Sequence, residues 1–415
     1  MKVCLLAPEL LPNQGGVGSY SVALARELSK LVDLSIITIL REKGSVTYDR
    51  DQMEEYFDHR IRIHTISKAG DTFLYNARFQ SAVLRELPRF VAQDGYDLIH
   101  SQHAHMPDLL YGQLHHEVPV IRTIHTTIAG QREGIRVARA LGGKLEPSER
   151  WQVALEPLLR LAEELTLRRR EHYITVSNWM KRTLVADGFP PDSVDVVYCG
   201  VDSDRFRPEA RVEGSLARTP GAPVVLFSGR PTLVKGGVVL ARAIPLILRE
   251  FPQVEFAFTG GGGEEFLTFL PSSEAFRSHL TFLGYIPFDE LPAVYASADL
   301  GVFPTFYENL PSRVLEVLSC GVPVVASEVG GIGEAVVSGT AGLLVPPGSP
   351  EALAEAILSI LRDPSLRARM GAQARSSVIE RFTWSRAASE TRDAYRRALD
   401  RQGDGEQPSA ATPRR

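Results

Sequence analysis

Short apolar runs alternate with longer amphipathic stretches through the first half of the chain. The apolar runs have the length of a buried strand, and apolar residues recur at helical spacing in the segments that follow them. The predicted strands are 3–7, 34–39, 62–66, 98–100, 120–124, 173–176 and 194–197, and the predicted helices are 18–31, 74–93, 107–116, 150–170 and 178–187. This alternation predicts a parallel, doubly wound sheet, because two parallel strands need a crossover connection.

The second half repeats the same pattern after a polar, Gly- and Pro-containing linker at 210–222. Its predicted strands are 224–228, 255–259, 280–282, 300–303, 324–326 and 342–345. Two such sheets in tandem predict two Rossmann-like α/β domains, with a ligand cleft between their facing carboxyl-end loops. The predicted boundaries are 1–205 for the first domain, 206–382 for the second, 383–400 for a last helix and 401–415 for a polar, disordered tail.

Length and charge agree with this division. A chain of 415 residues exceeds what one hydrophobic core usually holds. A formal net charge of −4 provides no overall basic field, so nucleic acid is not an expected partner. Cys4, Cys199 and Cys320 lie far apart and are interpreted as small buried residues in a reducing compartment. No apolar run approaches the roughly 18 residues of a membrane-spanning helix, which predicts a cytoplasmic protein.

Two glutamates stand eight residues apart in the segment FPTFYENLPSRVLEVLSCGVPVVAS, with Glu308 in a loop and Glu316 one turn inside the next predicted helix. Asn309 is a candidate N-cap of that helix, and Pro311 suits its first positions. At about 100° per residue, Asn309 and Glu316 would then project in nearly the same direction. A ligand over this helix start would meet backbone N–H groups suited to phosphate or sugar oxygens, and carboxylates that accept hydrogen bonds from hydroxyls.

A second segment, SGRPTLVKGG, places Arg230 and Lys235 between a predicted strand and a predicted helix. Two cations about 4 Å from phosphate oxygens would each contribute about 4 kcal/mol of attraction at an effective dielectric near 20. The segment is not a Walker loop, because the lysine is followed by two glycines. The pattern indicates a site for an anionic leaving group, and a solvated basic turn is the alternative.

A glycine-containing loop, NQGGVGSY, joins the first predicted strand to the first helix. Gly15 and Gly16 would let the backbone approach an anion at the helix start. The loop lacks the complete G-x-G-x-x-G spacing of a dinucleotide fingerprint, although Glu42 keeps an NAD-binding alternative open. The loop alone is therefore compatible with either kind of phosphate ligand.

Histidines concentrate in the first half of the chain. His103 and His105 form a candidate metal pair, but no H-E-x-x-H or similar spacing occurs, so no metal site is predicted. His125 follows the predicted strand 120–124 directly, and His103 lies just beyond the preceding strand. Both are expected at the carboxyl edge of the first sheet, where ligands bind.

The segment around Glu308 and Glu316 resembles the signature of the retaining, nucleotide-sugar-dependent glycosyltransferases of the GT-B fold, in the group similar to glycosyltransferase family 4. The resemblance extends over nearly the whole chain. A glycine often follows the first glutamate in that family, and Asn309 replaces it here. The resemblance implies that the last helix crosses back onto the first domain.

The resemblance also implies a role for each matching residue. Glu308 would contact the transferred sugar, Glu316 the ribose hydroxyls, and His125 the surroundings of the anomeric carbon. The remaining implied donor contacts are Asn309 and Leu310 through backbone N–H groups, Arg230, Lys235, Gly15 and Gly16 at the diphosphate, and Ile286 of the segment LGYIP at the base. His103 is a weaker candidate on the acceptor side.

The expected function is transfer of a hexosyl group, with retention, from a nucleoside-diphosphate sugar to a hydroxyl acceptor, without a cofactor or a metal. Acceptor determinants are expected in a loop at 126–146. Basic residues there and beyond would suit a phosphorylated acceptor or a peripheral membrane contact, against the alternative of a solvated face: Arg132, Arg136, Arg139, Lys144 and 168–170. A GT-B epimerase or disaccharide phosphorylase, a nucleotide-sugar sensor and an NAD-dependent dehydrogenase remain alternatives.

Overall fold

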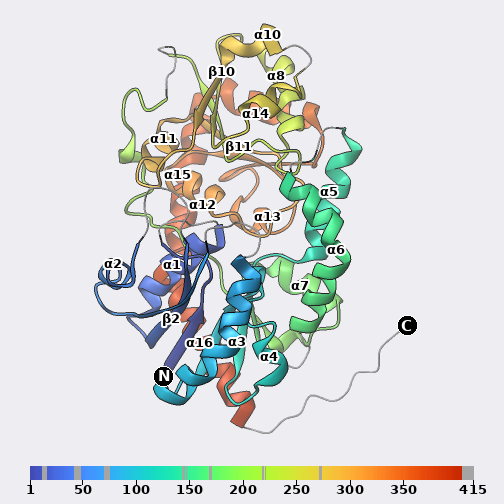
Figure 1. Ribbon diagram of the computed structural model, residues 1–415. Coiled ribbons are helices and arrows are strands. Elements are labelled where there is room, and N and C mark those ends of the chain that lie inside the picture. Colours follow the sequence, from blue (N-terminus) through green and yellow to red (C-terminus); the bar gives the residue numbers. More distant parts are fainter. Residues whose placement is uncertain are drawn as a thin grey trace. The chain divides into compact units, whose positions relative to one another are not determined.

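A computed structural model describes residues 1–11, 16–41, 48–69, 75–142, 145, 147–167, 171–216, 219, 221–270 and 273–403. The chain divides into two compact units (Figure 1). Unit 1 contains Met1–Thr127, Pro157–Tyr198 and the residues from Trp384 onward, and unit 2 contains Ile128–Glu156 and Cys199–Thr383. The predicted disordered tail lies outside the described residues from 404 onward.

Unit 1 is built on a seven-stranded sheet in the order β3-β2-β1-β4-β5-β6-β7, in which all neighbouring strands are parallel. The order reverses at β1, as it does in a doubly wound fold. The strands are β1 (Lys2–Leu6), β2 (Asp33–Arg41), β3 (Arg62–Ala69), β4 (Leu98–Gln102), β5 (Val120–Ile124), β6 (Tyr173–Thr175) and β7 (Val194–Val196). β1 and β4 are almost wholly buried, which explains their continuous apolar runs.

The helices of unit 1 are α1 (Gly16–Leu28), α2 (Arg50–Tyr56), α3 (Tyr75–Asp94), α4 (Tyr111–Leu114), α7 (Asn178–Ala186) and α16 (Trp384–Gly403), with 3-10 turns η1 (His103–His105) and η2 (Pro191–Ser193). α15 ends at Arg381 and α16 begins at Trp384, so a short break separates the two helices. α16 then packs against α1, and the Tyr395 hydroxyl lies 2.7 Å from Nδ1 of buried His100 in a hydrogen bond. The return of the last helix to unit 1 is therefore observed.

Two segments differ from their predicted structure. The segment 107–116 is helical only over α4, because turns occupy the residues before it. The supposed loop at 126–146 contains α5 (Ile128–Ala140), and α6 (Pro147–Thr166) follows it. Two glycines lower the intrinsic helix propensity of α5. Its buried face, which includes Ile135 and Ala138, supplies the packing that decides its conformation.

Unit 2 is built on a six-stranded parallel sheet in the order β10-β9-β8-β11-β12-β13. The strands are β8 (Val224–Ser228), β9 (Glu255–Thr259), β10 (Leu280–Gly284), β11 (Leu300–Phe303), β12 (Val324–Ser327) and β13 (Gly342–Val345). Its helices and turns are η3 (Pro208–Ala210), α8 (Gly237–Glu250), α9 (Gly263–Leu267), α10 (Ser273–Phe276), η4 (Arg277–His279), α11 (Leu291–Ser297), α12 (Ser312–Ser319), α13 (Ile332–Ala335), α14 (Pro350–Arg362) and α15 (Pro364–Arg381). α8 packs against α14 over one apolar core.

Both sheets agree with the predicted tandem of Rossmann-like α/β domains. All three cysteines are buried and free, as the sequence indicated. None of the helices among the described residues is both long and apolar enough to cross a membrane. The order of unit 2 reverses at β8, so the loops after β8 and β11 meet at the carboxyl edge where such sheets bind ligands.

Candidate functional site

The loops after β8 and β11 are tied together by backbone contacts. Phe306 donates its backbone N–H to the Val234 carbonyl at 2.9 Å, and the Thr305 hydroxyl donates to the same oxygen at 3.1 Å. Gly236 has φ 78°, and a Cβ there would overlap the Pro304 carbonyl oxygen. The glycine after Lys235 is therefore required by the close approach of the two loops.

This approach brings two predicted site residues together. The Lys235 ammonium donates to Oε1 of Glu308, with 47% of the lysine side chain and 22% of the glutamate side chain exposed. Arg230 lies in the same loop and is exposed. An exposed ion pair contributes only about 0–1 kcal/mol to stability. The charges at this edge are thus available to a ligand at little cost to the fold.

The backbone after Glu308 is held by a glycine turn. Gly331 donates its N–H to the Asn309 carbonyl at 2.7 Å. Gly330 has φ 58°, and a Cβ there would overlap the Glu308 carbonyl oxygen. This turn holds the backbone of Glu308 and Asn309 at the edge of the sheet.

The predicted N-cap at Asn309 is wrong. The N-cap of α12 is Pro311, which makes no side-chain capping hydrogen bond. Asn309 lies two residues before that N-cap and so outside the helix, and its carbonyl accepts a hydrogen bond from Gly331. The helical spacing of about 100° per residue therefore does not align Asn309 with Glu316. Asn309 and Leu310 are both buried.

Glu316 lies one turn inside α12, as predicted, and is partly buried. Burial raises the pKa of its carboxyl to about 7, while the nearby Arg313 charge opposes that rise. The Tyr295 hydroxyl is 2.6 Å from the Ser228 hydroxyl, and Arg313 Nη1 donates to Ser228 at 3.3 Å. Sequence reasoning missed Arg313, Tyr295 and Ser228, because their contacts join segments far apart in the chain.

Ile286 follows β10 and is partly buried, beside Tyr285, which is 86% exposed. Gly260 donates its N–H to the Gly284 carbonyl at 2.5 Å, which joins the loop after β9 to the end of β10. A Cβ at Gly260, whose φ is 87°, would lie 3.1 Å from the Gly229 carbonyl carbon. The loops after β8, β9 and β10 therefore adjoin one another at one edge.

The carboxyl edge of unit 1 carries His125, directly after β5. Its Nε2 lies 2.7 Å from Oε1 of Gln102, and its ring meets the Tyr20 ring edge to face with centroids 4.6 Å apart. Because an amide oxygen only accepts, Nε2 carries the proton in this assignment. Burial, reinforced by His105, His100 and His103, lowers the pKa of His125 to about 3. His125 is therefore a neutral imidazole near pH 7.

The other predicted site residues of unit 1, His103, Gly15 and Gly16, differ in their surroundings. His103 is buried, with Nε2 3.5 Å from Oε1 of Glu163. Gly16 begins α1, and a Cβ there would meet no described heavy atom within 4 Å, whereas Gly15 lies outside the described residues. Within the described part of the chain, no group of three His, Cys, Asp or Glu side chains is placed to hold a metal.

The basic residues near α5 are partly neutralised within the protein. Arg132 donates to Glu156 at 2.7 Å, and Arg136 pairs with Glu133 one helical turn away. Lys144 and the arginines at 168–170 lie outside the described residues. These ion pairs favour the interpretation of Arg132 and Arg136 as part of a solvated surface.

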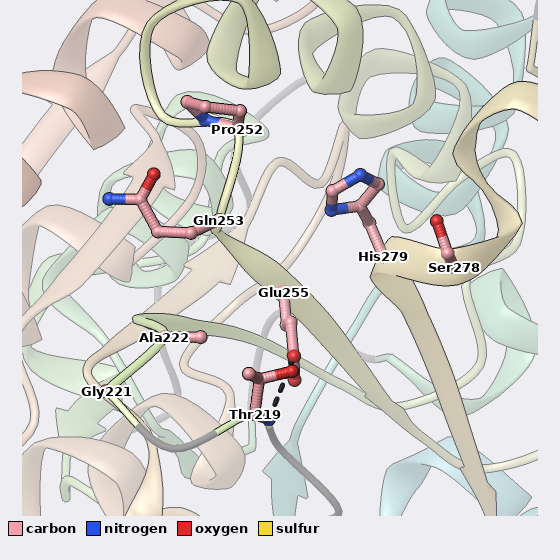
Figure 2. A pocket seen from close by; sticks show the side chains of 8 residues that line it. All are labelled: Thr219, Gly221, Ala222, Pro252, Gln253, Glu255, Ser278 and His279. Carbon is pink, nitrogen blue, oxygen red and sulfur yellow. Dashed lines mark hydrogen bonds between the residues drawn. The ribbon is translucent and has the colours of Figure 1, made fainter.

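A cavity of about 420 Å³ lies at the opposite, amino edge of the unit 2 sheet (Figure 2). The Thr219 backbone N–H donates to Oε1 of Glu255 at 3.0 Å across it. Among the described residues, its lining contains no lysine or arginine: Thr219, Gly221, Ala222, Pro252, Gln253, Glu255, Ser278 and His279. A cavity without a fixed cation is a poor match for a diphosphate, which leaves the carboxyl edge as the candidate site.

Comparisons with known proteins identify the family. Residues 14–205 match the family model "Glycosyltransferase Family 4", and residues 211–377 match "Glycosyl transferases group 1". A D-inositol 3-phosphate glycosyltransferase from Rhodococcus erythropolis is 31% identical over 99% of this chain and 93% of its own length.

Two solved structures are similar in fold. Sucrose-phosphate synthase from Thermosynechococcus elongatus has a TM-score of 0.75 at 21% identity, covering 96% of this chain and 99% of that one. Anabaena HepE in complex with UDP-glucose has a TM-score of 0.68 at 18% identity, covering 95% of this chain and 100% of that one. Together with the family matches, these likenesses show that the chain belongs to the glycosyltransferases of the GT-B fold.

Proposed function

We propose that the protein transfers a hexosyl group from a nucleoside-diphosphate sugar to a hydroxyl acceptor, with retention of anomeric configuration. The observation that carries the proposal is the ion pair of Lys235 with Glu308 at the carboxyl edge of unit 2, with Arg230 in the same loop as Lys235. Cations at this edge suit a diphosphate, which gains charge as it leaves the sugar. A carboxylate beside them suits sugar hydroxyls.

Each group at this edge has a distinct task in the proposal. Arg230 and Lys235 bind the diphosphate, and ligand phosphate competes with Glu308 for the Lys235 ammonium. Glu308 is then released toward the sugar hydroxyls. Glu316 accepts hydrogen bonds from the ribose, and the backbone near Ile286 meets the base.

The chemical step needs no side-chain nucleophile. The acceptor oxygen bonds to the anomeric carbon on the face from which the phosphate oxygen departs, and the acceptor proton passes to that phosphate oxygen. Neutral His125 contributes a polar but uncharged group to the acceptor-side unit. No cofactor is required by this route, since charge on the leaving group is balanced by Arg230 and Lys235.

The test is a donor panel of UDP-, GDP- and ADP-linked glucose and mannose, with nucleotide release as the readout. D-inositol 3-phosphate is included as an acceptor because it appears in the name of the Rhodococcus relative. We expect one nucleotide to be released in an acceptor-dependent manner, and NMR of the product to show the donor's anomeric configuration.

The other outcomes separate the alternatives. Donor binding without turnover favours a nucleotide-sugar sensor. A product with the opposite anomeric configuration to the donor rules out the retaining mechanism. Binding of NAD in preference to every sugar nucleotide would favour a dehydrogenase. If Glu316→Ala leaves donor affinity unchanged, the ribose assignment is wrong even where turnover is found.

A further inference from the structure

Two polar pairs join β4 to β5 and the residue after it, on one face of the unit 1 sheet. Nε2 of His100 lies 2.7 Å from the Thr123 hydroxyl, and Oε1 of Gln102 lies 2.7 Å from Nε2 of His125. Along each strand the two residues are two positions apart, so both pairs project from the same side. The first pair is fully buried, and so is Gln102, whereas His125 is partly exposed. Of the two pairs, the one with His125 therefore reaches the edge where a ligand can meet it.

The side chain of Gln102 makes one hydrogen bond and leaves one polar group unpaired. Its Nε2 is buried and has no hydrogen-bond partner among the described residues, so within them its one side-chain hydrogen bond is that with His125. A buried N–H without a partner destabilises a fold, and an apolar side chain would serve packing better at this position. The bond to His125 is therefore the feature that distinguishes Gln102 from a core residue.

This bond also decides which nitrogen of His125 carries a proton. Burial lowers the pKa of His125 to about 3, so the ring is neutral near pH 7 and has one N–H donor and one acceptor nitrogen. The Gln102 oxygen can only accept, which places the proton on Nε2 and the lone pair on Nδ1. The Tyr20 ring, which meets His125 at 4.6 Å and Trp384 at 5.5 Å, holds the plane of the imidazole without distinguishing its nitrogens. The choice of nitrogen thus falls to Gln102.

We propose that Gln102 is a positioning residue, whose side-chain oxygen holds His125 as the Nε2–H tautomer and so makes Nδ1 an acceptor for a hydroxyl of the substrate. The presence of a substrate hydroxyl at Nδ1 rests on the proposed function, whereas the tautomer does not. In the opposite tautomer Nδ1 would carry a proton and could not accept a hydrogen bond. Gln102 therefore controls how His125 can hold the substrate without touching the substrate itself.

The direct test reads the tautomer by ¹H–¹⁵N NMR in protein labelled with ¹⁵N-histidine, with His125→Ala used to assign the signal. We expect His125 of the wild type to show a protonated Nε2 and an unprotonated Nδ1 at pH 7, and Gln102→Met to give a mixture of tautomers. Thr123→Val is the matched control, because it removes the equivalent bond to His100, and it should leave the His125 signal unchanged. An Nδ1–H tautomer in the wild type, or an unchanged His125 signal in Gln102→Met, overturns the proposal.

Kinetics with the donor found in the nucleotide-sugar panel add the functional readout. We expect Gln102→Met to lower kcat/KM about 10-fold, the worth of one hydrogen bond, and Thr123→Val to leave it unchanged. Urea titration should show the reverse order, with the larger loss of stability in Thr123→Val, because Gln102→Met also removes the unpaired N–H. Calorimetry with UDP, GDP and ADP should show unchanged affinity in Gln102→Met, since the nucleotide is assigned to unit 2. Equal losses of kcat/KM in the two variants would indicate a general packing role and overturn the proposal.

Three further outcomes separate this proposal from the one on which it rests. A Gln102→Met loss that persists in the residual activity of His125→Ala means that Gln102 contacts the substrate itself, which overturns the positioning role. A protein in which Gln102 sets the tautomer but no donor is turned over supports the coupling of Gln102 to His125 and refutes the proposed function. Turnover by a protein whose His125 tautomer does not depend on Gln102 has the opposite meaning.

Discussion

The two units share a parallel, doubly wound sheet but place different chemistry at its carboxyl edge. In unit 1 the residue after β5 is His125, whose pKa of about 3 makes it neutral. In unit 2 the loops after β8 and β11 carry Arg230, Lys235 and Glu308, which bear charge. Two sheets of the same kind thus present a neutral histidine in one unit and paired charges in the other. The difference comes from a few loop residues rather than from the strands.

One ion pair of each unit also shows a difference in burial. In unit 1, Asp108 and Arg122 are buried and joined by bonds of 2.7 and 2.8 Å, and Ser101 and Glu171 complete the cluster. In unit 2, the Lys235–Glu308 pair lies in a largely open position. A buried pair is held in place for the fold, whereas an exposed pair can exchange its partner for a ligand.

The largest expected effect on stability tests the structural role of the buried pair. Arg122→Met leaves the Asp108 carboxylate buried without its cation, which should lower the free energy of unfolding by about 3–5 kcal/mol. Urea titration measures the loss, and the double variant with Asp108→Leu should recover much of it. A loss below about 1 kcal/mol in the single variant would show that the cluster is not structural.

The exposed pair of unit 2 should behave in the opposite way. Lys235→Met is expected to lower kcat/KM by about 10²–10³-fold, since a cation on the leaving diphosphate is lost. Its free energy of unfolding should change by less than about 1 kcal/mol. Arg362→Met, which removes another exposed ion pair of unit 2 with Glu250, is the matched control and should leave kcat/KM unchanged. Equal losses of activity in both variants would contradict the assignment.

A smaller effect tests the packing of α5 within unit 2. A Cβ at Gly134 would lie 2.5 Å from Cβ of Tyr307, the residue before Glu308. The overlap should cost about 1–3 kcal/mol and outweigh the roughly 1 kcal/mol that alanine contributes to a helix. Urea titration measures the change, with Gly333→Ala in α13 as the matched control, because a Cβ there would meet the Leu344 side chain at an ordinary 3.5 Å. A Gly134→Ala protein more stable than wild type would show that α5 does not pack on Tyr307.

The smallest expected effect distinguishes the units by pH. Burial lowers the pKa of His100 to about 3, so the unfolded chain binds a proton first as pH falls below about 6.5. Its contribution to stability is complete above that pH and is lost by about 1.4 kcal/mol per pH unit below it. Glu316 has the opposite sign: its pKa is raised to about 7, so its contribution is present below about 4.5 and is lost as pH rises through 7.

Urea titrations between pH 5 and 8 measure how the free energy of unfolding changes with pH for both groups. His100→Asn should flatten the acid loss of stability, and Glu316→Gln should remove the loss that accompanies rising pH. An acid slope that is the same in His100→Asn and wild type would contradict a neutral, buried His100.

Much of the fold followed from local pattern. The strands β1, β4 and β8 are buried parallel strands, and such strands need continuous apolar runs that are visible in any sequence. Glu308, Lys235 and Arg230 were also predictable as a group, because residues just after parallel strands converge at one edge of a sheet. Asn309 was misread as a helix cap, since the turn at Gly330 and Gly331 that holds its carbonyl lies about 20 residues further along the chain.

The sequence by itself determined the two alternating α/β halves, the charged loops of the second and the histidines of the first, because hydrophobic period and loop position are local properties. Only the tertiary structure decided the helical state of α5, the pairing of Lys235 with Glu308 and the contact of Arg313 with Ser228. Ser228 and Arg313 are 85 residues apart in the chain. Such contacts depend on the order of the strands in the sheet and on the burial of the contacting side chains. Neither can be predicted from the spacing of neighbouring residues.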